Sequence, residues 1–138
     1  DALKADVLIN IPIAKHHGLA GLTLGMKNLM GLIWRREEIH WQIGEKLTDL
    51  TRLIKPTLTV VDAVRILVEN GPTGGNLADV RETNTIIVSP DIVAADSYAA
   101  SLFGLRPMDL SYIRAASEAG LGRSDVENLR IEEISLGG

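Results

Sequence analysis

Cysteine is absent from this sequence of 138 residues, and its absence removes several kinds of chemistry. A disulfide framework, a thiolate metal site and a cysteine nucleophile all need that side chain. Any bound metal would have to use histidine, aspartate, glutamate or carbonyl ligands. A hydrolase-type serine nucleophile is not supported either, because the sequence contains no Gly-x-Ser-x-Gly motif.

Aromatic residues are also scarce, so leucine, isoleucine, valine and alanine must form the core. Hydrophobic residues make up 46% of the chain and charged residues 23%, which is typical of folded globular proteins and not of disordered ones. The length predicts a single domain spanning residues 1–138. Because the chain starts at Asp1, without methionine and close to its first predicted strand, we expect it to be part of a longer protein.

The chain has neither a surplus of positive charge nor a long apolar run. Its formal net charge of -4 offers no electrostatic footprint for a nucleic acid, since such binding depends on clustered lysine and arginine. The longest apolar runs fall below the roughly 20 residues needed to span a bilayer, and no signal peptide opens the chain. We therefore expect a cytoplasmic protein with no nucleic-acid partner and no membrane partner.

Short segments rich in β-branched residues alternate with segments of helical periodicity. Strands are predicted at 5–13, 57–64, 84–89 and, as an edge strand, 130–136. Helices are predicted near 23–34, 43–54, 91–103 and 109–119. Strands separated by helices favour an α/β fold with a mainly parallel sheet and helices on both faces.

Polar residues follow the predicted strands at positions where a ligand would bind in such a fold. In an open α/β sheet the binding crevice lies beyond the carboxyl ends of the strands. The candidates at these ends are Asn10, Lys15, His16, His17, Asp62, Ser89 and Asp91. Each of them could instead simply cap a turn or end a strand.

Asp96 lies on the apolar stripe of the helix predicted at 91–103, four residues after Ile92 and three before Ala99. A buried carboxylate needs a lysine, a metal or several hydrogen-bond donors, or else it is protonated. The alternative to a functional role is a buried carboxylate that fixes a loop.

The stretch at 14–32 combines two lysines, two histidines, an asparagine and four glycines in an otherwise apolar passage. With Thr23 as the helix cap, Gly21, Gly25, Asn28 and Leu32 share one face, which would let a backbone or a ligand approach closely. Lys15 and Lys27 would bind an anion such as phosphate or carboxylate, or would neutralise the aspartates. Adjacent His16 and His17 point to opposite sides of an extended segment, so both cannot bind one metal. A metal site built on one of them with His40 is the less favoured alternative, and we assign no metal ligands.

The segments "ADVLINIPIAKHHGLAGLTLGMKNLMGL", "KPTLTVVDAV", "NGPTGG" and "SPDIVAADSYAASLFG" together resemble the C-terminal half of the domain-of-unknown-function family 362. The resemblance covers nearly the whole chain. His16 stands where the family more often has threonine, so His17 is the better match. The residues that match the family's motifs are Asn10, Pro12, Lys15, His17, Lys27, Asn28, Gly31, Asp62, Gly71, Pro72, Gly75, Asp91 and Asp96.

The resemblance also implies a redox setting, because family members are frequently fused to ferredoxin-like modules with iron-sulfur clusters. This chain has no cysteine, so such a module would have to lie elsewhere. It further implies that the family's N-terminal half is missing, so we expect either a homodimer or an exposed apolar patch where that half would pack. The cofactor is left open.

Two functions remain open at this point. In the first, the chain binds and turns over a small anionic substrate, with His17, Lys27 and Asp96 as catalytic residues and His17 as proton shuttle. The ligand-binding residues would then be Asn10, Lys15, Asn28, Asp62, Ser89 and Asp91. In the second, the same residues hold an anion or a metal in a non-catalytic module that serves an iron-sulfur partner.

Overall fold

The structure, a computed structural model, describes residues 2–137. It contains five strands: β1 (Ile9–Asn10), β2 (Ile13–His17), β3 (Gly21–Thr23), β4 (Leu58–Leu67) and β5 (Val80–Ser89). Its four α-helices are α1 (Gly25–Asn28), α2 (Ile43–Ile54), α3 (Ile92–Ser101) and α4 (Ser111–Glu118). Short 3-10 turns connect several of these elements.

The five strands form one sheet with parallel strands at its centre and antiparallel strands at its edges. Strands β1 and β2 follow one another along the same side of β4 and run parallel to it. Strand β3 pairs antiparallel with β2, and β5 pairs antiparallel with β4 on its other side. The predicted α/β class with a mainly parallel sheet is therefore confirmed.

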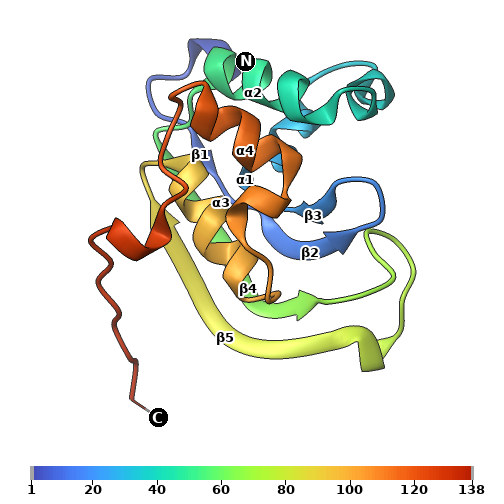
Figure 1. Cartoon of the computed structure of the whole chain (residues 1–138), viewed down its shortest axis with the longest axis vertical. Coiled ribbons are helices and arrows are strands. Elements are labelled where there is room, and N and C mark those ends of the chain that lie inside the picture. Colours follow the sequence, from blue (N-terminus) through green and yellow to red (C-terminus); the bar gives the residue numbers. More distant parts are fainter. Residues whose placement is uncertain (1, 138) are drawn as a thin grey trace.

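The helices cover one face of the sheet, and not both faces as the sequence suggests. Helix α3 packs on β4 and β5, α1 packs on β4 and α3, and α2 packs on α4. Figure 1 shows the four helices grouped on one side of the long strands β4 and β5. The core between helices and sheet includes Leu24, Met26, Leu47, Ile66 and Tyr112, all fully buried.

The opposite face of the sheet is exposed and largely apolar. Ile9, Ile11 and Ile13 alternate with buried residues along β1 and β2 and are 52%, 63% and 56% exposed. Ile86 and Val88 of β5 are 62% and 59% exposed. Because Asp62 pairs with Ile13 on one side and Ile86 on the other, its side chain shares this surface. We call Ile9, Ile11, Ile13, Asp62, Ile86 and Val88 the open face.

The predicted helices match the structure well where their apolar periodicity is long. The segment 43–54 is helix α2 along its whole length, while α3 and α4 begin and end within a few residues of their predicted limits. Asp91 caps α3 by accepting the backbone N–H of Ala94 at 3.0 Å, and Gly104 follows its end with φ at +73°. The segment 23–34 instead divides into α1 and a 3-10 turn, Leu29–Leu32.

The strand predicted at 84–89 is present as the last part of β5, and the strand predicted at 130–136 is wrong. Strand β5 runs antiparallel to β4, because the residues between them form a long hairpin loop without a crossover helix. The segment 130–136 forms no strand and extends away from the body of the molecule (Figure 1). Its alternating sequence indicates which residues could face a core, but a strand also needs a hydrogen-bonded neighbour. None of the described strands pairs with it.

Candidate functional site

His17 ends β2 and is held by the turn that follows. Its Nδ1 accepts the backbone N–H groups of Leu19 and Ala20, each at 3.2 Å. A nitrogen that accepts hydrogen bonds carries no proton, so the ring proton of neutral His17 lies on Nε2. The residue is 7% exposed. The turn therefore fixes both the orientation and the tautomer of this side chain.

Burial and the charge of Lys27 lower the pKa of His17 from 6.5 to about 4. The ring is consequently neutral at pH 7 and presents Nε2–H as a hydrogen-bond donor. It stacks on His40, with the ring centroids 5.8 Å apart and the ring planes at 20°. Among residues 2–137 no group of three or more histidine, aspartate or glutamate side chains is arranged to hold a metal ion.

Lys27 of α1 is the second notable side chain, since it is only 9% exposed. Burial lowers its pKa, and the nearby charges of Lys15 and Arg36 lower it further. Its ammonium group forms no hydrogen bond or ion pair with a described residue. We refer to Lys15, His17, Lys27, Arg36 and His40 as the basic cluster, because they influence one another electrostatically.

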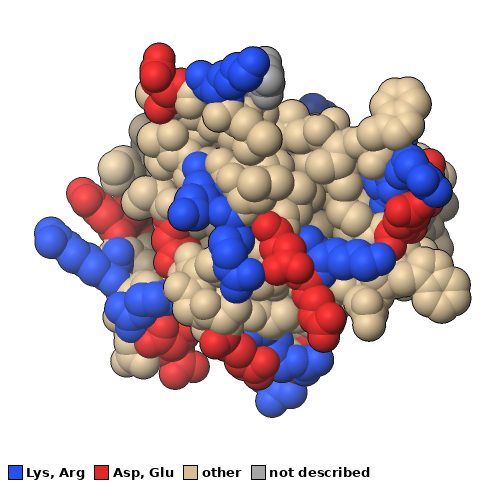
Figure 2. Space-filling view, turned by 90° about the horizontal axis from the view of Figure 1, so that it is seen from above, with Lys and Arg blue, Asp and Glu red and all other residues tan. Residues whose placement is uncertain are grey.

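Four ion pairs between described residues are exposed and join residues two or three positions apart in the sequence. Arg35 pairs with Glu38, Arg52 with Asp49, Arg106 with Asp109 and Arg123 with Asp125. Pairs of this kind contribute little to stability. Figure 2 shows acidic and basic side chains interspersed over the face that it displays. The basic cluster differs from this pattern because no acidic side chain is paired with its buried lysine.

Asp96 of α3 is fully buried and binds the start of α1. Its two oxygens accept the backbone N–H groups of Gly25 at 2.7 Å and Met26 at 2.9 Å. Burial raises the pKa of Asp96 to about 7, although these hydrogen bonds favour the ionised form and oppose that shift. Gly25 is required there, because a Cβ at this position would lie 2.7 Å from Asp96 Oδ1. Asp96 therefore caps α1 from a distance of about 70 positions along the chain.

Asn10 and Asn28 complete the hydrogen bonding around α1. Asn10 Nδ2 donates to the carbonyl of Gly25 at 2.9 Å, and Asn10 Oδ1 accepts from Asn28 Nδ2 at 2.8 Å. Three of the predicted site residues, Asn10, Asn28 and Asp96, thus belong to one network that fixes the helix carrying Lys27. Thr23 is not the cap of this helix, because Leu24 occupies that position.

Ser89 and Asp91 lie at the opposite end of β4 from Lys15, whereas Asp62 lies beside Ile13 in the middle of that strand. Asp62 is on the open face, where its Oδ1 accepts the N–H of Val64. Ser89 pairs with Thr59 at the start of β4, because β5 is antiparallel and ends where β4 begins. Asp91, next to it, caps α3 and also accepts the N–H of Arg123 at 2.9 Å. His16, the other histidine of β2, accepts the N–H of Gly71 at 3.1 Å.

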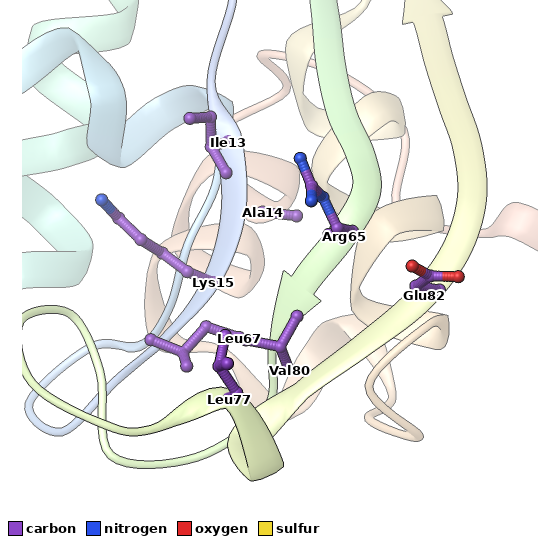
Figure 3. A pocket seen from close by; sticks show the side chains of 8 residues that line it. All are labelled: Ile13, Ala14, Lys15, Arg65, Leu67, Leu77, Val80 and Glu82. Atoms are coloured by element: carbon purple, nitrogen blue, oxygen red, sulfur yellow. The ribbon is translucent and has the colours of Figure 1, made fainter.

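A hollow of about 480 Å³ lies beside Lys15, at the end of the open face. Figure 3 shows Leu67, Leu77 and Val80 gathered at one end of it, with Lys15, Arg65 and Glu82 extending their charged groups around it. A second hollow of about 460 Å³ is lined by His40 together with residues of α2 and α4. Arg36 and Arg65 were not predicted as site residues, since no local motif marks either arginine.

The architecture defines an α/β domain with a short capped helix that presents an unpaired lysine. The chain belongs to the family described as a domain of unknown function (DUF362), whose model matches residues 1–101. The family membership expected from the sequence is thereby confirmed over residues 1–101. The family description states no function.

The chain is also 30% identical over 136 residues to the thylakoid-associated protein sll1697 of Synechocystis. The aligned part is 92% of this chain and 41% of that relative, so the chain spans less than half of the relative's length. No solved structure matches the chain. None of the helices among the described residues has the length and apolarity needed to cross a membrane.

Proposed function

We propose that this chain is an anion-binding domain in which Lys15, His17 and Lys27 hold a small phosphate or carboxylate ligand. The observation that carries the proposal is Lys27, whose side chain is only 9% exposed, lacks an acidic partner among the described residues and lies near two further cations. Burying an uncompensated charge is unfavourable. A bound anion would remove that penalty, which makes the cluster selective for negative charge.

His17 supports the same function through its protonation state. As a neutral ring with its proton on Nε2, it can donate one hydrogen bond to an oxygen of the ligand. A bound anion would also raise the pKa of His17, because it offsets the effect of Lys27. Binding would thus bring the ring closer to the range in which proton transfer is useful at neutral pH.

The roles of Asp96, Asn10 and Asn28 in this proposal are indirect. They fix α1, the helix that carries Lys27. Direct ligand contacts by Asp62, Ser89 and Asp91, catalysis by His17, Lys27 and Asp96, service to an iron-sulfur partner, a homodimer and a cytoplasmic location stay predictions. The neutral state of His17 favours binding over turnover in the free protein.

The proposal is tested by titrating the protein with inorganic phosphate and with citrate, and observing the Cε1–H resonance of His17 by NMR. We expect saturable binding and a rise in the pKa of His17 above about 4 when ligand is present. Lys27→Met should abolish both effects. Lys55→Met removes the same charge from an exposed position and should leave both unchanged. Equal loss in the two variants would show only a non-specific charge effect.

A further inference from the structure

We propose that the open face is the docking surface for an additional polypeptide layer, formed by amphipathic helices that present a lysine or arginine to Asp62. We assign this layer to the part of the longer family proteins that has no counterpart in this chain. The open face borders the anion site, because Ile13 and Lys15 line the same hollow, but the inference uses none of the three residues proposed to hold the anion.

The first support is the apolar character of the open face. Five isoleucine and valine side chains on the two sides of β4 are each more than half exposed. Ile13, Asp62 and Ile86 form one row across the sheet. Contiguous apolar surface of this kind is uncommon on soluble proteins and marks an interface. Sheets with parallel strands at their centre are usually covered on both faces.

The second support is the length of the related protein. The aligned segment is only 41% of the Synechocystis relative, so more than half of that relative consists of chain that could supply the missing layer. Alignment of 92% of the present chain means that nearly the whole sheet has a counterpart there. The same surface would therefore need to be covered in the longer protein.

The third support is the charge at the centre of the face. Asp62 lies between Ile13 and Ile86, and its carboxylate has one hydrogen bond, from the N–H of Val64. A second copy docked with Asp62 near the symmetry axis would bring two carboxylates together, which is unfavourable. A helix that carries one basic residue among apolar ones would satisfy Asp62. The charge therefore favours a different polypeptide over a second copy.

The test compares how strongly a photogenerated carbene labels side chains in this chain and in the full-length Synechocystis relative, read by mass spectrometry. We expect strong labelling of Ile11, Ile86 and Val88 in this chain and several-fold weaker labelling of the aligned peptides in the relative. Ile134 is 76% exposed and lies off the sheet, so its peptide is the internal control for labelling of an uncovered isoleucine in this chain.

In a chimaera, this chain replaces the aligned segment of the relative, so that carbene labelling can be measured on this chain's own residues. Ile11 and Ile86 should become protected there, and Asp62→Lys should restore their labelling while Asp62→Asn restores less. If the chimaera does not fold, the labelling of the full-length relative decides alone. In the isolated chain, Ile86→Lys should leave the melting temperature unchanged, because the side chain is already in solvent.

Three results would overturn the proposal. Labelling of the aligned peptides that is as strong in the relative as in this chain would show that its extra chain does not cover this face. Protection that disappears when the relative is diluted from dimer to monomer would identify a second copy as the occupant. Protection that requires vesicles of anionic lipid would identify a membrane surface instead.

Discussion

Asp96 and Lys27 are both buried and ionisable, and both are linked to helix α1: Lys27 belongs to it, and Asp96 of α3 accepts hydrogen bonds from its first residues. Their surroundings nevertheless differ. Asp96 has a backbone N–H group on each oxygen. Lys27 has no hydrogen bond or ion pair with the described residues and has other cations nearby. Hydrogen bonds offset part of the cost of burying the Asp96 carboxylate, whereas no described partner offsets the burial of Lys27, which is therefore available to a ligand.

The largest effect is expected when the Asp96 carboxylate is removed. Asp96→Ala leaves two buried N–H groups at the start of α1 without acceptors and should lower the free energy of unfolding by about 3 kcal/mol or more. Asp96→Asn keeps one acceptor and should cost about 1–3 kcal/mol. Urea unfolding measures both. If Asp96→Ala costs under about 1 kcal/mol, the carboxylate does not hold α1.

Gly25→Ala tests the same contact between Asp96 and α1 by changing the residue on the α1 side. The new Cβ would meet Asp96 Oδ1 at 2.7 Å and Thr59 Cγ2 at 3.0 Å, so the carboxylate or the sheet must shift. We expect a loss of about 1–3 kcal/mol in the free energy of unfolding. Gly31→Ala is the matched control, because a Cβ there meets nothing within 4 Å. Equal losses in the two variants would contradict the close approach.

The pH dependence of stability should report the burial of His17. Its pKa is lowered from 6.5 to about 4, so the unfolded chain binds the proton more readily than the folded chain between these values. The contribution of His17 to stability is therefore fully present above about pH 6.5 and is lost as the pH falls toward 4. Asp96, whose pKa is raised to about 7, acts in the opposite direction over this range, so the difference between the parent and a His17 variant isolates the His17 contribution. His17→Asn keeps an acceptor for the turn and should reduce this dependence. Melting temperatures measured from pH 4 to 8 check it.

The smallest effect on stability is expected at Lys27. Lys27→Met removes an unpaired buried charge, so the free energy of unfolding should stay within about 1 kcal/mol of the parent or rise. The changes in the free energy of unfolding caused by Lys27→Met and by Asp96→Asn should add within about 0.5 kcal/mol in the double variant, because the two side chains do not pair. A coupling energy well above that value, from a double-mutant cycle, would show that the two charges interact and form one site.

The sequence identifies the helices more reliably than the site. Helix α2 and the cap of α3 follow from apolar spacing and from Asp91, which are local signals. The family motifs correctly select Asn10, Asn28 and Asp96 as residues that belong together, although the contacts among them show a structural network. The prediction that Ser89 and Asp91 join Lys15 assumed parallel strands throughout. Antiparallel β5 places Ser89 and Asp91 at the other end of the sheet.

By itself, the sequence determined the α/β class, the family and the residues whose chemistry is unusual, because periodicity and motifs are properties of neighbouring positions. Only the tertiary structure decided which of these residues have hydrogen-bond or ion-pair partners. Asp96 meets Gly25 and Met26, about 70 positions away, and so becomes a helix cap. Lys27 is buried without an acidic partner, and one face of the sheet is left open. Such outcomes depend on contacts between distant segments, which no local pattern encodes.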